Sequence, residues 1–226
     1  QRLILRMLDK RQEDLIDALR SRASHVNRVF IDFDGVVIDS EPLQYQCYAA
    51  CLHEYGFTFT QEEFLESYLG NSELENWNTL RDRIGLAASA QELTTQRYDI
   101  LMAALLAPSV TANWFIAPLI QWCHEKGIVP EILSANQTNI IEAVCDHVGL
   151  SDLKQHIYSL HEITPQISKP ELIDQLTDGD ASRCLIIEDS ASTLEQATKR
   201  NMFSIGVRHS LNRHKQLDAD IFVNSD

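Results

Sequence analysis

Short apolar runs alternate with helical stretches over most of this chain, and this alternation restricts its possible folds more than any other feature. Runs that are apolar at nearly every position are typical of parallel strands covered on both faces. Strands that alternate with helices of about ten or more residues indicate a doubly wound parallel sheet. The sequence therefore predicts an α/β fold, with strands at 29–32, 129–133, 157–160, 184–187 and 202–207, a weaker one at 220–223, and helices at 114–126 and 136–148.

A segment between the first and second predicted strands breaks this rhythm, because it contains helical patterns alone. An all-helical insertion at this point is expected to lie over the carboxyl ends of the strands, where open α/β sheets bind ligands. We therefore predict a cap domain. The helices are expected at 43–54, 62–69, 74–84 and 90–106, and the predicted domains are an N-terminal helical extension (1–25), a catalytic core (26–41 and 111–226) and a helical cap (42–110).

The start of the chain differs in charge from the remainder. Residues 1–28 contain seven basic and four acidic side chains, whereas the rest of the chain contains 12 basic and 29 acidic ones. Residues 2–22 have apolar positions at roughly helical spacing, which predicts an extra helix outside the catalytic fold. Such a helix packs on its own domain or on a partner, so oligomerisation through it is one hypothesis.

Composition excludes several classes of protein. The formal net charge of −14 argues against a nucleic-acid or anionic-membrane surface, since both require clustered Lys and Arg. No window resembles a membrane span, and 44% apolar residues suffice for a sizeable core. No CxxC pair is formed by the five cysteines, at positions 47, 51, 123, 145 and 184. The first residues, which start at Gln1, lack the pattern of a signal peptide. We expect a cytoplasmic chain, trimmed at its start, with reduced cysteines.

Polar residues follow three of the predicted strands. The first strand runs into Asp32 and continues through Asp34 and Gly35, the second ends in the stretch 134–136, and the fourth is followed by 188–190. Carboxylates at the ends of two buried strands repel one another unless a cation lies between them. Oxygen ligands of this kind suit Mg²⁺. The sequence therefore predicts a magnesium site.

This set of groups fits phosphoryl transfer. A metal ion and the ammonium of Lys169 would neutralise the phosphate oxygens, which leaves one carboxylate to attack phosphorus. Asp34 points elsewhere than Asp32 and is suited to proton transfer, while Gly35 allows the backbone to turn close to the phosphate. Ser168 resembles the start of a capping box, which is compatible with Lys169 reaching the site.

Other chemistries fit less well. An EF-hand loop fails, because Val36 and Val37 stand where oxygen ligands and glycine are needed. The chain has no GxSxG and no HExxH, and its eight histidines are interpreted as surface or packing residues. Asp39 and Ser40 are interpreted as hinge and turn residues.

The DxDGVxxDSE run at 32–41, Ser134, Lys169-Pro170 and the 188–190 triplet occur in the order of the four motifs of the haloacid dehalogenase-like superfamily. More narrowly, the chain resembles the branch of small phosphatases and β-phosphoglucomutases that carry a helical cap after the first motif. The resemblance covers about residues 28–224.

The resemblance implies a role for each matching position. Asp32 resembles the nucleophile that forms an aspartyl-phosphate and also binds Mg²⁺. Asp34 resembles the general acid/base, which offers its backbone carbonyl to the metal. Further implied metal ligands are Asp189 and, directly or through water, Glu188. The implied phosphate-binding residues are Ser134, Ala135, Asn136 and Lys169.

The cap distinguishes phosphatases from mutases within this branch. Mutases usually carry a His where this chain has Gln44, and an Arg where it has Glu73. Residues 42–110 also contain three Arg against nine carboxylates, which disfavours a doubly phosphorylated substrate. The leading hypothesis is a Mg²⁺-dependent phosphatase of small phosphomonoesters, with sugar phosphates among the candidates. The alternatives are a phosphohexose mutase and a catalytically inactive binding or regulatory protein.

Overall fold

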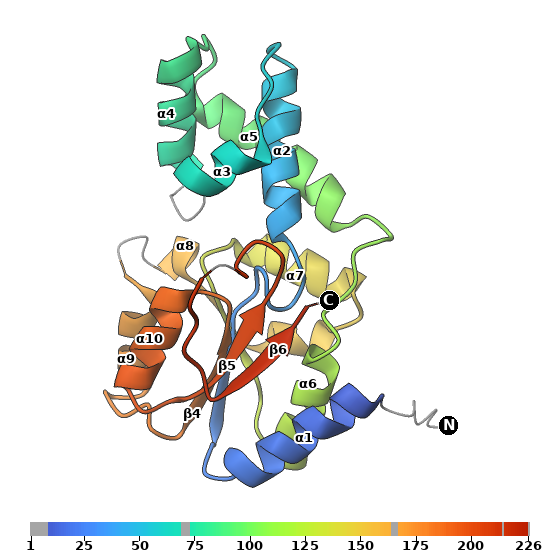
Figure 1. Ribbon diagram of the computed structural model, residues 1–226, viewed down its shortest axis with the longest axis vertical. Helices are drawn as coiled ribbons and strands as arrows, with labels where there is room; N and C mark the ends of the chain where they lie inside the picture. The colour runs from blue at the N-terminus through green and yellow to red at the C-terminus, as the bar shows by residue number, and fades with distance from the viewer. Residues whose placement is uncertain (1–8, 69–72, 164–166, 214, 226) are drawn as a thin grey trace. The chain divides into compact units, whose positions relative to one another are not determined.

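The computed structural model describes residues 9–68, 73–163, 167–213 and 215–225. Its described residues form one six-stranded sheet in which every neighbouring pair is parallel (Figure 1). The strand order is β3-β2-β1-β4-β5-β6. The bounds are β1 (Arg28–Ile31), β2 (Glu131–Ser134), β3 (Ile157–Ser159), β4 (Cys184–Glu188), β5 (Phe203–Arg208) and β6 (Ile221–Asn224). The predicted α/β fold is confirmed.

The strand order places a topological switch point in the middle of the sheet. From β1 the chain adds β2 and then β3 on one side, and it then crosses to add β4 on the other side of β1. Phe30 of β1 pairs with Glu131 of β2 and with Ile186 of β4. In open parallel sheets, ligands bind at the carboxyl ends of the strands beside such a point. The carboxyl ends of β1 and β4 therefore meet where a ligand site is expected.

The second strand begins later than its apolar run predicts. The expected range was 129–133, but β2 starts at Glu131, directly after Pro130. A proline has no N–H to donate to a neighbouring strand, so it is confined to the edges and starts of strands. Val129 is half-exposed, whereas all four residues of β2 are buried. Proline thus moves the strand two residues along, and the strand ends on Ser134.

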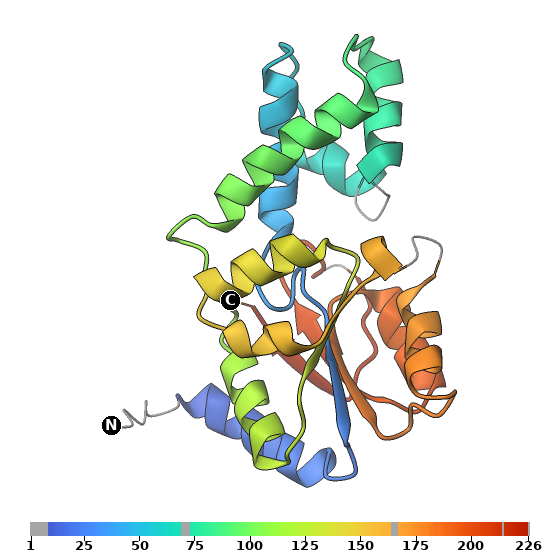
Figure 2. The same ribbon diagram turned by 180° about the vertical axis from the view of Figure 1, so that it is seen from behind.

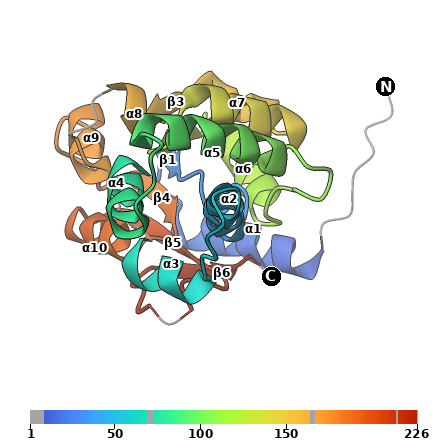
Figure 3. The same ribbon diagram turned by 90° about the horizontal axis from the view of Figure 1, so that it is seen from above.

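Helices cover both faces of the sheet. In the view from above, α9 and α10 lie on one side, and α1, α6 and α7 lie on the other (Figure 3). In the view from behind, α9 and α10 lie to the right of the sheet, and α1 and α6 lie to its left (Figure 2). A cluster that includes Phe30, Leu133 and Ile186 packs the first face against α9 and α10. The bounds are α6 (Ile116–Glu125), α7 (Thr138–His147), η1 (Ser151–Gln155), α8 (Leu160–Ile163), α9 (Lys169–Leu176) and α10 (Ala191–Lys199).

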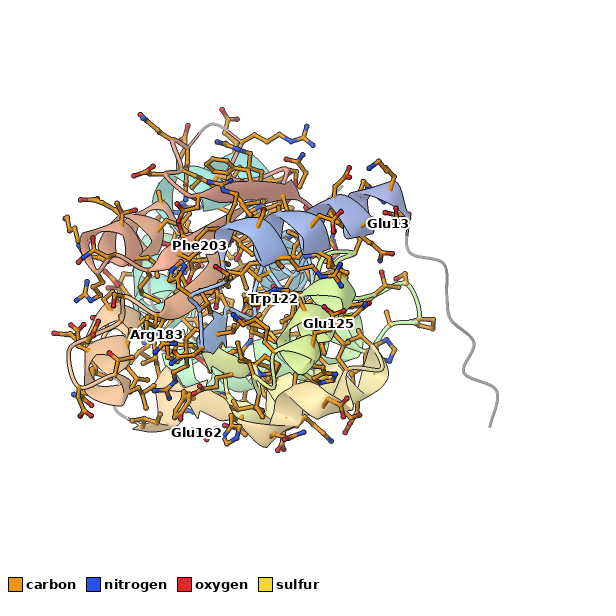
Figure 4. All side chains as sticks on the ribbon, turned by 90° about the horizontal axis from the view of Figure 1, so that it is seen from below. Glu13, Trp122, Glu125, Glu162, Arg183 and Phe203 are labelled. Carbon is orange, nitrogen blue, oxygen red and sulfur yellow. The ribbon has the colours of Figure 1, made fainter. Side chains whose placement is uncertain are left out.

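The N-terminal helix packs on this same unit. The predicted helix covers 2–22, of which 2–8 lie outside the described residues. Within the described part, α1 (Lys10–Arg22) begins after a capping box formed by Asp9 and Gln12. Its apolar residues Leu15, Ile16 and Leu19 are buried, and it lies beside the Trp122–Glu125 end of α6 (Figure 4). Arg20 donates to Glu125 at 2.9 and 3.0 Å. The apolar face of α1 is therefore buried against its own chain. Oligomerisation through this helix stays a prediction.

The helical insertion forms a second unit. Contacts divide the chain into residues 1–39 with 111–226, and residues 40–110. The described part of the second unit contains α2 (Glu41–His53), α3 (Gln61–Ser67), α4 (Glu73–Ile84) and α5 (Ala90–Leu105). Its core is aromatic: Tyr48 and Trp77 lie with ring centroids 4.8 Å apart, and Phe59 and Phe64 pack around Tyr48. Within the described ranges, no helix of either unit is long and apolar enough to span a bilayer.

Candidate active site

Asp32 is the first residue after β1, and its carboxyl group is buried. Its N–H donates to the carbonyl of Ile187 on β4, so its backbone continues the hydrogen bonding of β1 to β4. Its Oδ1 accepts the N–H of Phe33 at 2.8 Å, which fixes the side chain at the strand end. The chain then turns, and Asn113 holds the turn by donating to the carbonyl of Val36 at 2.8 Å and to that of Val37 at 2.9 Å.

Glu188 and Asp189 occupy the neighbouring strand end. Glu188 closes β4 and is 1% exposed. Its Oε1 accepts the N–H groups of Asp189 and Ser190, both at 3.1 Å. Ser190 is the N-cap of α10 and accepts the N–H of Thr193. The two acidic side chains are thus positioned by the transition from strand to helix.

Lys169 reaches both strand ends from the first turn of α9. The capping box that the sequence predicts is present: Ser168 accepts the N–H of Glu171, and the Glu171 carboxylate accepts the N–H of Ser168 at 2.8 Å. The Lys169 ammonium lies 2.6 Å from Asp32 Oδ1 and 2.9 Å from Glu188 Oε2. A half-buried lysine therefore bridges the nucleophile candidate and the last residue of β4.

Three carboxylates lie together at these strand ends: those of Asp32 and Glu188 are buried, and that of Asp189 is half-buried. Asp32, Glu188 and Asp189 each offer an oxygen, and the three oxygens lie within 4.8 Å of one another. Burial raises the pKa of Asp32 well above its usual range, the Glu188 carboxylate adds to the rise, and Lys169 opposes it. Burial also raises the pKa of Asp189, against the opposing hydrogen bond with His209.

Lys169 and Glu188 show the opposite balance. Burial disfavours the charge on Lys169, but Asp32 and Glu188 outweigh that effect and raise the pKa of Lys169. Burial likewise disfavours the Glu188 carboxylate, yet Lys169 lowers the pKa of Glu188. Lys169 brings one positive charge to the three carboxylates of the cluster, so negative charge remains on Asp32 and Asp189 when they are ionised. Carboxylate oxygens of this kind suit a hard divalent cation. The residues present therefore fit Mg²⁺.

The end of β2 supplies the residues predicted to bind phosphate. Ser134 is buried, and its hydroxyl oxygen accepts the N–H of Asn136 at 3.0 Å. Ser159, at the end of β3, donates to the carbonyl of Asn136 at 2.7 Å. Asn136 Nδ2 also donates to Asp34 Oδ2 at 3.2 Å. Ala135, which lies between Ser134 and Asn136 in the chain, is exposed. The side chain of Asn136, a residue expected to bind phosphate, thus contacts the acid/base candidate.

Sequence reasoning missed two residues that contact Asp189. All eight histidines were interpreted as surface or packing residues, but His209 is buried with Nε2 2.8 Å from Asp189 Oδ2. Asn212 Nδ2 donates to the backbone carbonyl of Asp189 at 3.1 Å. His209 follows the last residue of β5, so the signal that could have found it is its place at the same edge of the sheet.

Position 35 requires glycine for two reasons, its backbone conformation and the close approach of Asp189. Its φ of +73° is strained for any other residue, and a Cβ there would lie 2.4 Å from Asp189 Oδ2. Gly35→Ala is expected to lower the free energy of unfolding by about 3 kcal/mol and to displace Asp189. Gly149→Ala is the matched control, because φ is +75° and a Cβ would meet nothing within 4 Å. Chemical denaturation checks this, and equal losses in the two variants would contradict it.

The fold and the site together define a class: a doubly wound α/β protein with an acidic, lysine-containing site at its switch point. A sequence profile of the haloacid dehalogenase-like hydrolases matches residues 29–207. The chain belongs to this family. No curated protein sequence matches the chain.

Solved structures share the fold at low sequence identity. The CbbY protein of Rhodobacter sphaeroides, in complex with xylulose-(1,5)bisphosphate, has a TM-score of 0.74 and 16% identity, covering 88% of this chain and 93% of that one. A β-phosphoglucomutase of Clostridium difficile has a TM-score of 0.67 and 20% identity, covering 88% and 90%. A family hydrolase of Deinococcus radiodurans, with bound phosphate and sodium, has a TM-score of 0.62 and 19% identity, covering 88% and 91%.

Proposed function

We propose that this protein is a Mg²⁺-dependent phosphatase that hydrolyses a small phosphomonoester through an aspartyl-phosphate on Asp32. The observation that carries the proposal is the Lys169 ammonium, buried between Asp32 and Glu188 at the switch point. Family membership and the acidic cluster with Asp189 support it. Phosphate and a phosphorylated sugar are bound by two of the proteins that share the fold.

The first step forms a bond between Asp32 and phosphorus. Asp32 Oδ1 accepts from Lys169 and from the N–H of Phe33, so we assign the attack to Oδ2. As the Oδ2–P bond forms, the ester P–O bond breaks and the leaving oxygen takes a proton from Asp34. Asn136 holds the Asp34 carboxyl group in place. Ser134 and Lys169 supply donors for the phosphate oxygens.

The second step releases phosphate. A water molecule attacks phosphorus, Asp34 takes the proton that the water loses, and the Oδ2–P bond breaks to restore the Asp32 carboxylate. Mg²⁺ would be held by Asp32, Asp189 and the backbone carbonyl of Asp34, and it would supply positive charge against the phosphate oxygens. Glu188 already accepts from two N–H groups and Lys169, so its proposed contribution to the metal is indirect.

The helical unit favours a phosphatase over the mutase alternative. Glu73 lies 3.0 Å from the guanidinium of buried Arg97, which also donates to Gln44 and lies over the Tyr48 ring. Arg83 is likewise paired, with Glu63. The described part of this unit therefore presents two of its three arginines already paired, which leaves less positive charge for a second phosphate. The remainder of the mutase motif, 69–72, lies outside the described residues.

A substrate panel tests the proposal. Sugar phosphates and other small monoesters are incubated with Mg²⁺ or with EDTA, and both free phosphate and isomerised sugar phosphate are measured. We expect phosphate release that requires Mg²⁺, returns when Mg²⁺ is added after EDTA, and exceeds any isomerisation. Faster isomerisation would establish the mutase instead. Mg²⁺-dependent ligand binding without turnover would establish a binding protein.

The cellular location and substrate class complete the proposal. The five cysteines are all free and buried, which supports a reducing, cytoplasmic location. Burial raises the pKa of Cys123 to about 12, so this thiol is suited to packing and not to nucleophilic catalysis. The proposed partner is a small-molecule phosphate ester, with no nucleic acid or membrane.

A further inference from the structure

The loop after β5 contains two buried polar residues that turn toward Asp189. His209 and Asn212 are each 3% exposed. His209 Nε2 lies 2.8 Å from Asp189 Oδ2, and Asn212 Nδ2 donates to the Asp189 carbonyl at 3.1 Å. One residue thus contacts the side chain of Asp189 and the other its backbone. Buried polar groups on a loop cost stability unless they are paired, so this arrangement fixes the loop as well as Asp189.

Internal hydrogen bonds hold this pair in one geometry. The Asn212 side chain accepts the N–H of His209 at 2.9 Å and donates to the carbonyl of Val207 at 2.9 Å. His209 Nδ1 faces the N–H of Leu211 at 3.3 Å. An N–H group can only donate, so Nδ1 must act as the acceptor and carry no proton. We therefore assign the Nε2–H tautomer, in which His209 donates to Asp189 Oδ2.

Gly35 encloses the same oxygen. A Cβ at position 35 would lie 2.4 Å from Asp189 Oδ2 and 3.4 Å from His209 Nε2. The backbone of Gly35 and the imidazole of His209 therefore occupy the space beside Oδ2. A carboxylate enclosed in this way cannot turn about its side-chain torsion without losing its hydrogen bond.

We propose that His209 is a positioning residue, which holds Asp189 Oδ2 so that the other carboxylate oxygen stays directed to a divalent cation. Asn212 supports it by holding the Asp189 backbone. The inference rests on the proposed function for its biological role, but it concerns metal affinity, which is measurable without substrate. Hydrogen-bonded partners of metal-ligating carboxylates commonly contribute about 10- to 100-fold to metal affinity.

The test compares two substitutions of His209 by titrating Mg²⁺ alone, using calorimetry and the rise in melting temperature with Mg²⁺. His209→Phe keeps a flat ring but has no donor, and we expect its dissociation constant for Mg²⁺ to rise by about tenfold or more. His209→Gln keeps an N–H donor and is expected to recover most of that loss. Unchanged affinity in His209→Phe, or equal losses in both variants, would overturn the inference.

Two further measurements separate positioning from simple stability. Ser204→Ala is the structural control, because Ser204 is buried on β5 and bonds to Asp220, away from Asp189. It is expected to lower the melting temperature in EDTA without changing Mg²⁺ affinity. Should His209→Phe fail to fold, ¹⁵N NMR of the wild-type imidazole decides. A protonated Nε2 and unprotonated Nδ1 support the inference, and any other protonation pattern overturns it.

The outcomes also distinguish this inference from the proposed function. A protein that releases phosphate, but whose His209→Phe variant binds Mg²⁺ normally, would refute the positioning role alone. A protein that releases no phosphate, but whose His209→Phe variant binds Mg²⁺ tenfold more weakly, would refute the phosphatase alone.

Discussion

Asp32→Asn is expected to lower the rate of phosphate release by at least about 10³-fold, which corresponds to roughly 4 kcal/mol of transition-state stabilisation. The amide oxygen is a poor nucleophile, so the covalent step that the proposed mechanism requires is lost. The change is nearly isosteric, and Lys169 keeps its contact with Glu188 at 2.9 Å, so the variant is expected to fold. Initial rates with the best substrate of the panel, at saturating Mg²⁺, measure the effect.

The covalent intermediate gives this prediction a second readout. Acid-quenched wild-type enzyme is expected to carry a phosphoryl group that hydroxylamine removes, and Asp32→Asn is expected to carry none. Asp146→Asn serves as the control, since Asp146 is an exposed carboxylate paired with Lys154. It should keep the wild-type rate. An Asp32→Asn variant that retains activity would show that the nucleophile lies elsewhere.

Lys169→Met is expected to have the second largest effect. It removes the ammonium that contacts both Asp32 and Glu188, and breaking a buried ion pair from one side typically costs about 3–5 kcal/mol. We expect a loss of this size in the free energy of unfolding in EDTA. The loss should be smaller with Mg²⁺, because the cation replaces part of the missing positive charge. Phosphate release should fall by about 10²-fold or more, since a donor to the phosphate is lost.

Guanidinium denaturation of wild type and variant, in EDTA and in Mg²⁺, tests this prediction. Lys199→Met is the matched control, because Lys199 forms an exposed ion pair with Glu195 one helical turn away. Such surface pairs contribute less than about 1 kcal/mol. Equal destabilisation by the two substitutions would show that Lys169 is not part of a buried charge network.

The fold, and the place of most candidate site residues at one edge of the sheet, were predictable for one physical reason. Parallel strands buried on both faces have continuous apolar runs, and the residue after each run lies at one common edge. Asp32, Ser134 and Glu188 were found in this way, and the structure places Asp32 and Glu188 on either side of Lys169. Their catalytic roles remain proposals.

The residues that escaped prediction depend on packing between distant segments. His209 and Asn113 occur in no local motif, and their neighbours Asp189 and Val36 are remote in the chain. The shift of β2 to Glu131 had a visible signal in Pro130, but the apolar pattern alone included the two residues before the strand. Sequence patterns thus located the edge of the sheet, whereas the partners that hold each carboxylate depend on tertiary contacts.

The order in which the site is assembled follows from the central position of β1. Phe30 must pair with Ile186, and Asp32 must meet Lys169 and Asp189, after a long helical insertion has intervened. Contacts so remote in sequence form late, because loop-closure entropy opposes them, whereas the neighbouring helices of residues 40–110 close short loops. During synthesis, the carboxylates of the site therefore stay apart until the chain has passed β4. The proposed cation site would thus assemble only after β4 has paired with β1.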